Sequence, residues 1–290
     1  MLRNNIFNKN LNLDNLDLEY FPNGLANFDF LECISFYNNR LKELPAELWS
    51  IKSLRHLNAS ANEITFIPKE IERLENLHIL DMNGNKLSAL PESLYQIPLS
   101  KYLYMADNRF SAIPEVVTKL NQLNYLNFSG NKITQLPENI GCLESLIELR
   151  VYHNLIGEIP YSIGQCNQLR ELHCMKNQIR RLPDEMGNLS ELRILDCSDN
   201  QIEKIPDRLG LLKSLKILNF RNNHLNSLAD EIGSLSDLLY LDLRNNNLKE
   251  LPMSLLKLKQ LEKLDLRCNK YLKYPNWLVE LEKNGCIILH

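Results

Sequence analysis

Short stretches of the chain alternate apolar and polar residues, and each stretch ends at an asparagine. One instance is Leu192, Leu195, Cys197, Asn200, Ile202, Ile205 and Pro206. The period of two before the asparagine predicts a short β-strand with one buried face. Apolar residues three apart beyond the proline predict a short helical segment with one buried side. The pattern therefore predicts a unit of strand, turn and short helix.

This unit recurs with a period of 23 residues, and the asparagine never leaves its place. Its positions are Asn39, Asn62, Asn85, Asn108, Asn131, Asn154, Asn177, Asn200, Asn223, Asn246 and Asn269. A fixed period of this length predicts stacked repeats rather than a globule. A carboxamide carries both a donor and an acceptor, so it can satisfy backbone groups in its own turn and in the next one. We interpret the asparagine ladder as structural, and we expect it to contact no ligand.

Proline and glycine also recur in fixed places. Proline opens the helical segment of nearly every repeat, where its fixed φ suits a helix start, and Ala229 is the exception. Glycines follow an apolar residue of that segment in five repeats, and we interpret them as helix-terminating turns. They are Gly141, Gly164, Gly187, Gly210 and Gly233. Ser100 stands where a core leucine is expected, so we predict that Leu99 enters the core instead.

The repeats divide the chain into three parts. Residues 1–27 form an N-terminal cap and a degenerate first repeat, with Leu16 where the asparagine should be. Residues 28–275 hold eleven repeats of 23 residues, and residues 276–290 form a C-terminal cap with a final strand. Terminal repeats are expected to depart from the common pattern because they face water on one side.

The frame L-x-x-L-x-L-x-x-N-x-L-x-x-L-P resembles the leucine-rich repeat over about residues 11–289. The 23-residue length with Leu-Pro and Ile-Gly resembles the intracellular Ras-group type, known from signalling scaffolds and many bacterial proteins. The resemblance implies an α/β solenoid: a horseshoe with a concave parallel β-sheet and short helical or 3-10 segments on the convex side. It also implies a protein-binding role in intracellular signalling or host interaction.

Composition narrows the partners. The net charge is −3, and nothing in the composition suggests a polyanion as the partner. A nucleic-acid-binding protein normally carries a basic stripe, so we expect no nucleic-acid binding. No apolar run approaches the roughly 18 residues of a transmembrane helix, and the N-terminus has no signal-peptide pattern, so we expect no membrane insertion. Seven cysteines without paired spacing favour a reduced, cytoplasmic chain. A secretion route that uses another signal would leave no trace in this pattern.

Solvent-facing strand positions are where function can differ between repeats. The third strand residue is small and polar or acidic in most repeats, but it is Tyr104, Arg150 and His173 in three central ones. Aromatic residues and arginine dominate interface hot spots. We therefore hypothesise a protein-binding central patch, with cross-strand stacking of tyrosines as the purely structural alternative. The patch comprises Tyr102, Tyr104, Tyr125, Arg150, Tyr152, His153, His173 and Met175.

An arginine column follows in the later repeats, at Arg221, Arg244 and Arg267. One interpretation is an anchor for an acidic or phosphorylated partner segment. The other is an internal lattice with Asp242 and Asp265, which lie two positions upstream, and we favour it because three like charges in a column repel each other.

Catalytic and metal chemistry find little support in the sequence. Cys33 and His56 take equivalent strand positions and could act as nucleophile and base, but no orienting third group accompanies them. His153 and His173 could share a metal, but no third ligand stands at a suitable spacing. We expect no enzyme activity, no metal and no cofactor.

Two functional interpretations remain. The first is a monomeric binding module or adaptor that engages a protein through the concave face. The second is a structural repeat protein that dimerises through the strand edge at residues 286–289, where the apolar residues have no polar cap.

Overall fold

The computed structural model describes residues 2–290, so the part of the N-terminal cap assigned to Met1 lies outside the described residues. The chain forms two compact units, Met1–Ile133 and Thr134–His290. Each unit is built from the same repeat, and each is described by itself.

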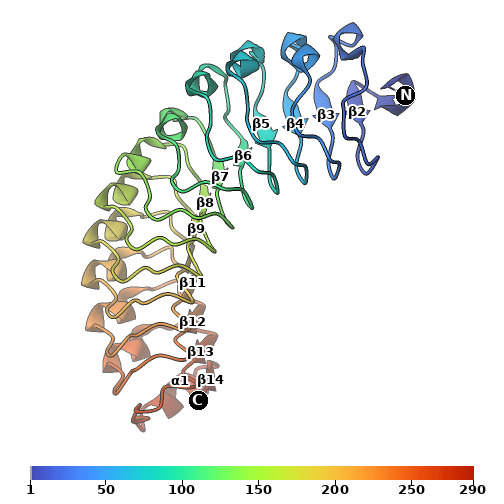
Figure 1. Cartoon of the computed structure of the whole chain (residues 1–290). Coiled ribbons are helices and arrows are strands. Elements are labelled where there is room, and N and C mark those ends of the chain that lie inside the picture. Colours follow the sequence, from blue (N-terminus) through green and yellow to red (C-terminus); the bar gives the residue numbers. More distant parts are fainter. Residues whose placement is uncertain (1) are drawn as a thin grey trace. The chain divides into compact units, whose positions relative to one another are not determined.

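The first unit carries a row of short strands in chain order (Figure 1). The hairpin of β1 and β2 pairs antiparallel, with Ile6 opposite Leu11. All later pairs in this unit are parallel and join residues 23 positions apart, such as Leu57 and Leu80. The strands are β1 (Ile6–Phe7), β2 (Asn10–Asn12), β3 (Cys33–Ser35), β4 (His56–Asn58), β5 (Ile79–Asp81), β6 (Tyr102–Tyr104) and β7 (Tyr125–Asn127).

The second unit continues the pattern with parallel strands in chain order. Leu195 lies opposite Leu172 on one side and Leu218 on the other. The strands are β8 (Glu148–Arg150), β9 (Glu171–His173), β10 (Ile194–Asp196), β11 (Ile217–Asn219), β12 (Tyr240–Asp242), β13 (Lys263–Asp265) and β14 (Ile287–Leu289).

Short 3-10 helices lie across each unit from its strands (Figure 1). In most repeats the predicted proline is the residue just before the helix, with extended backbone, and Ala229 copies that conformation at φ −75° and ψ 154°. The first unit has η1 (Leu2–Asn5), η2 (Leu25–Asn27), η3 (Ala46–Ser50), η4 (Lys69–Arg73), η5 (Glu92–Gln96) and η6 (Glu115–Lys119). The second has η7 (Ile140–Cys142), η8 (Tyr161–Gln165), η9 (Asp184–Asn188), η10 (Asp207–Leu211), η11 (Asp230–Ser234), η12 (Met253–Lys257) and α1 (Leu278–Lys283).

The core of each unit lies between its strands and its helices. The middle residue of nearly every strand is fully buried, and Phe36, Phe110, Phe128 and Phe220 are among the largest buried side chains. Leu99 is only 2% exposed, which confirms that it enters the core beside Ser100. The predicted α/β solenoid, with parallel strands on one face and 3-10 helices on the other, is confirmed within each unit.

The recurring glycines have a different role from the one predicted. Gly187 lies inside η9 rather than after it, and its φ is not in the left-handed region. A Cβ atom at Gly187 would lie 2.5 Å from the backbone oxygen of Arg208 in the next repeat. The interpretation as helix-terminating turns is therefore wrong, because these glycines are required for close packing of neighbouring helices.

The asparagine ladder is buried and bonds two coils at once. The Asn200 amide nitrogen donates to the carbonyl of Cys197 in its own coil and to that of Cys174 in the preceding coil, both at 3.0 Å. Its side-chain oxygen accepts the backbone N–H of Ile179 at 3.0 Å. Asn200 thus bonds two coils, as predicted, but the second coil is the preceding one and not the next. The residue before each ladder asparagine takes a left-handed conformation, which completes the sharp turn.

Candidate functional site

The third strand residue closes the turn that follows each strand. Its short side-chain oxygen accepts the backbone N–H of the residue two positions later, as Asn58 does from Ser60 at 3.0 Å. The same bond is made by Asn12, Asp81, Asn127, Asp196, Asn219, Asp242 and Asp265. The predominance of small polar residues in this column therefore has a structural cause.

Tyr104, Arg150 and His173 occupy the same position but carry no short-stemmed oxygen that could close the turn. In the repeat of Tyr104, a residue of the preceding coil makes the turn-closing bond instead. The side-chain oxygen of Asn83 accepts the backbone N–H of Ala106 at 2.6 Å. These three residues depart from what the fold requires of the column. Because the fold does not explain these three residues, they are candidates for a binding role.

Three tyrosines of the first unit form a cluster on its strand face. Tyr102 and Tyr104 of β6 flank the buried Leu103, and Tyr125 of β7 lies opposite Tyr102. The ring centroids are 5.6 Å apart for Tyr102–Tyr104, 5.4 Å for Tyr102–Tyr125 and 4.9 Å for Tyr104–Tyr125. Tyr102 is 38% exposed. This tyrosine cluster presents a rigid aromatic surface, since each ring is held by the other two.

Arg150 and His173 belong to the second unit and meet around one carboxylate. The Nε atom of Arg150 donates to Glu148, and Nε2 of His173 lies 3.8 Å from the same carboxylate oxygen. Nε2 of His173 is also 3.0 Å from Glu171. Sequence reasoning overlooked Glu148 and Glu171, although they stand 23 residues apart and two positions before Arg150 and His173.

The other residues of the central patch lie in the turns after β8 and β9. His153 is exposed and has a φ of 57°, and its backbone N–H donates to the carbonyl of Met175 at 2.9 Å. Tyr152 and Met175 are half-buried. The central patch is thus divided between the two units, with its tyrosine cluster in the first and its remaining members in the second.

The arginine column is an ion-pair lattice within the second unit. Arg221 contacts Asp199 at 3.1 Å, Arg244 contacts Asp242 at 2.6 Å, and Arg267 contacts Asp265 at 2.7 Å. Burial would raise the pKa of Asp265, but its bonds to Arg267 and the charge of Arg244 hold that pKa below its ordinary value. The predicted pairs with Asp242 and Asp265 are present, but Arg221 pairs with Asp199, which the lattice interpretation did not include. The anchor for an acidic partner stays a prediction, and these contacts already engage the charges that it would use.

A shallow groove of about 190 Å³ lies on the strand face of the second unit, over β11, β12 and β13. Tyr240 lines it and is partly exposed, and its hydroxyl donates to Glu262 at 2.8 Å. Its lining combines apolar, polar and charged residues, namely Ile217, Leu218, Asn219, Tyr240, Leu241, Asp242, Lys263 and Asp265.

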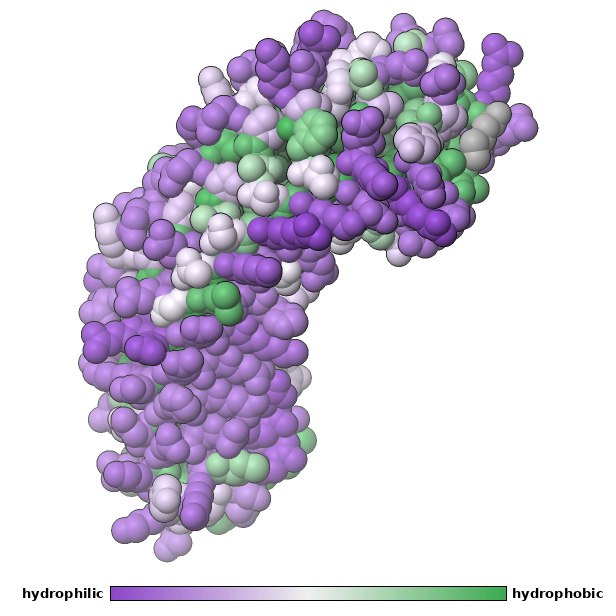
Figure 2. All heavy atoms as spheres, viewed as in Figure 1, coloured by the Kyte–Doolittle hydropathy of each residue, from purple (hydrophilic) through white to green (hydrophobic). Residues whose placement is uncertain are grey.

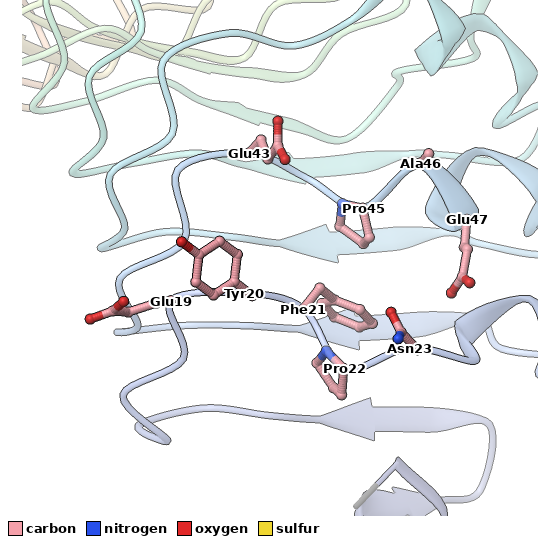
Figure 3. A pocket seen from close by; sticks show the side chains of 9 residues that line it. All are labelled: Glu19, Tyr20, Phe21, Pro22, Asn23, Glu43, Pro45, Ala46 and Glu47. Carbon is pink, nitrogen blue, oxygen red and sulfur yellow. The ribbon is translucent and has the colours of Figure 1, made fainter.

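A larger cavity of about 370 Å³ opens at the start of the first unit (Figure 3). Two of its three carboxylates already have partners: Glu47 accepts the N–H groups of Gly24 and Leu25, and Glu19 lies 3.8 Å from Arg40. In Figure 3 the Glu19 side chain points away from Phe21 and Pro22. The cavity is therefore better explained by packing between two coils than by a convergent ligand site.

Cys33 and His56 lie opposite each other on β3 and β4, as the repeat requires. Burial raises the pKa of the Cys33 thiol and lowers the pKa of the His56 imidazole. Both shifts favour the neutral groups, whereas a nucleophilic cysteine needs its thiolate stabilised. The pair does not have the electrostatics of an activated nucleophile.

In the view of Figure 2 the repeats of the second unit are mainly hydrophilic, with isolated apolar residues between polar ones. Within residues 2–290, no helix combines the length and the apolar character that crossing a membrane requires.

Comparison with known proteins places this repeat in a family. Residues 52–95 and 190–234 match the family described as "Leucine Rich repeats (2 copies)", and residues 213–271 and 122–143 match two further descriptions of the leucine-rich repeat. No curated protein sequence matches the chain. The matched segments together cover about half of the sequence, and the chain belongs to the leucine-rich-repeat family.

Solved structures extend the comparison. The leucine-rich-repeat protein LIC12759 of Leptospira interrogans is 30% identical over 94% of this chain and 82% of its own, with a TM-score of 0.65. The functional domain of InlJ from Listeria monocytogenes, which includes a cysteine ladder, is 26% identical over 93% of this chain and 55% of its own, with a TM-score of 0.79. The ectodomain of the Arabidopsis thaliana receptor kinase GASSHO1/SCHENGEN3, in complex with CASPARIAN STRIP INTEGRITY FACTOR 2, is 28% identical over 82% of this chain and 30% of its own, with a TM-score of 0.73.

Proposed function

We propose that the chain is a non-catalytic protein-binding module that engages a protein partner through the strand faces of its repeats. We further propose that it works in the cytoplasm as an adaptor or scaffold, in signalling or host interaction. The leucine-rich repeat is a common protein-interaction fold, and the Arabidopsis ectodomain similar to this chain was solved with a bound factor. The observation that carries the proposal is the tyrosine cluster of Tyr102, Tyr104 and Tyr125.

The tyrosine cluster has the physical features of an interface anchor. Tyr104 stands in a column where the fold favours a small turn-closing residue, so its presence is not explained by the turn. Tyrosine buries a large area on binding while fixing only two side-chain torsions. Ring contacts already restrict those torsions here, which lowers the entropy lost when a partner docks.

The strand face of the second unit supports the same proposal with different chemistry. Arg150 and His173 replace the usual small residue there, and the groove beside Tyr240 is lined by both apolar and charged residues. The proposed surface also includes Tyr152, His153 and Met175. The arginine column, Arg221, Arg244 and Arg267, has a secondary place in it because the arginines already form ion pairs with aspartates.

Affinity purification from the native host tests the proposal. Wild-type chain is compared with a Tyr102→Ala/Tyr125→Ala variant and with Tyr95→Ala, whose exposed ring lies on η5 at the opposite side of the same unit. Loss of a hot spot costs about 2 kcal/mol or more, so the dissociation constant of a recovered partner should rise about 30-fold in the double variant. Tyr95→Ala should leave it unchanged. Equal recovery of every partner by the double variant would refute the role of the tyrosine cluster.

Self-association is the second candidate function. Strand β14 pairs with β13 in parallel, and Ile287 on it is 61% exposed, so an apolar strand lies at this edge of the described chain. If the edge pairs two copies, the mass measured by light scattering should double with concentration, and Ile288→Lys should abolish the change. A monomeric mass at high concentration would exclude this candidate.

A further inference from the structure

Glu148, Glu171 and His173 form a group of potential metal ligands in the second unit, which we call the Glu–His cluster. Glu148 of β8 and Glu171 of β9 lie directly opposite each other, and His173 follows two residues later on the same face of β9. One ligand atom from each residue lies within 4.8 Å of the other two. The side chains of Glu148 and His173 are only 18% and 16% exposed, so the cluster is partly shielded from water.

The distances suit a small divalent ion. Nε2 of His173 lies 3.0 Å from Oε2 of Glu171 and 3.8 Å from Oε1 of Glu148. Ligands about 2.0–2.2 Å from a tetrahedral ion are separated from one another by about 3.3–3.5 Å. Small side-chain rotations therefore bring all three atoms to coordination distance without moving the strands.

The charges also favour a cation at this place. Two carboxylates directly opposite each other on adjacent strands repel, and Arg150 compensates one of them through its bond to Glu148. Asp196, opposite His173 on β10, is not counted as a ligand, because its oxygens already accept from Ser198 and Asn219. The cluster therefore keeps a net negative charge. It offers one imidazole nitrogen beside two carboxylate oxygens, which is a mixed N/O ligand set and not a simple acidic surface.

We propose that the Glu–His cluster binds one divalent first-row transition-metal ion such as Zn²⁺, through Nε2 of His173 and one oxygen each of Glu148 and Glu171. The imidazole nitrogen selects such an ion over Mg²⁺ or Ca²⁺, which prefer oxygen ligands alone. Three protein ligands leave a fourth position for water or for a group from a partner. The site shares His173 with the proposed binding surface of the second unit but uses no residue of the tyrosine cluster, and binding a metal ion goes beyond the protein binding proposed above.

Calorimetric titration of the full chain with Zn²⁺ tests the proposal. We expect one ion per chain, and an affinity that falls at least about tenfold in His173→Gln and in Glu171→Gln, since losing even an outer partner of a ligand costs about 10–100-fold. His153→Gln is the matched control, because this exposed histidine lies outside the cluster. Circular dichroism confirms that each variant is folded.

Exposed thiols are the competing ligands, at Cys142 and Cys268. A Cys142→Ser/Cys268→Ser variant should retain the site, and Co²⁺ bound in place of Zn²⁺ should show no thiolate-to-metal charge-transfer band. The proposal is overturned if the wild type does not bind Zn²⁺, if His173→Gln and Glu171→Gln bind as tightly as the wild type, or if the cysteine variant loses the site.

Discussion

Replacement of one ladder asparagine tests the energetic role assigned to the whole column. Asn200 is 6% exposed, and its bonds reach three neighbouring backbone segments. In Asn200→Ala the carbonyl of Cys174 keeps its bond from Asn177, and the carbonyl of Cys197 keeps its bond from Asn223. The backbone N–H of Ile179 has no such second partner in the ladder, so it is the group that the substitution leaves buried and unsatisfied.

The magnitude follows from these contacts. One orphaned buried N–H costs about 1–3 kcal/mol. The two N–H groups of the Asn200 amide are shared among the carbonyls of Cys174, Cys197 and Ser198, and each N–H contributes about 0.5–1.5 kcal/mol. We therefore expect Asn200→Ala to lower the free energy of unfolding by about 3–4 kcal/mol. Asn200→Asp should add a pH dependence, because its carboxylate would face the carbonyl oxygens of Cys174 and Cys197. Burial beside these oxygens raises the pKa of that carboxyl, so the stability deficit should grow as pH rises from about 4 to 7.

Urea unfolding followed by circular dichroism measures both variants. Asn247→Ala is the control, since Asn247 directly follows a ladder asparagine but its side chain is exposed. A loss below about 0.5 kcal/mol for Asn200→Ala, within the range of ordinary surface substitutions, would refute the structural account of the ladder. An Asn200→Asp deficit that is equal at pH 4 and pH 7 would refute the electrostatic part.

The other predictions concern packing and one half-buried carboxylate. Gly187→Ala should lower the free energy of unfolding by about 1–3 kcal/mol, because its Cβ would overlap the backbone oxygen of Arg208, whereas Gly157→Ala, where a Cβ meets nothing within 4 Å, should not destabilise in the same urea assay. Burial raises the pKa of Asp81, so the folded state holds its proton more tightly and stability falls as pH rises above the ordinary carboxyl value of 3.8. Asp81→Asn keeps the bond from the Asn83 N–H and should be more stable than the wild type at pH 7, with a gain that vanishes in acid; equal stability at both pH values would contradict the assignment.

Much of the fold could be predicted because the same pattern of apolar, asparagine and proline positions recurs in each repeat. The 23-residue phase determines which residues pair, and a proline marks where most helices begin. The glycine role was missed because a helix-terminating glycine and a close-packed glycine occur at similar sequence positions, and only the distance from Gly187 to Arg208 separates them. The Glu–His cluster was harder to predict, because it also depends on distances between side chains of different repeats. The third strand residues were recognised as exceptions, but the partners of His173 come from side chains two positions earlier on two strands.

The repeat frame gives a way to separate structural from functional residues without comparing homologues. Within one chain, each column shows what the fold requires at that place, and the turn-closing column requires a short side-chain oxygen. Tyr104, Arg150 and His173 give up that bond, and a residue that forgoes a local hydrogen bond needs another reason to be there. The tyrosine cluster and the Glu–His cluster each include such a residue, although they lie in different units and have unrelated chemistry. His173→Asn should therefore preserve or raise stability while it weakens metal binding. Tyr104→Asn should weaken partner binding without a gain in stability, because Asn83 already bonds the turn N–H in that repeat.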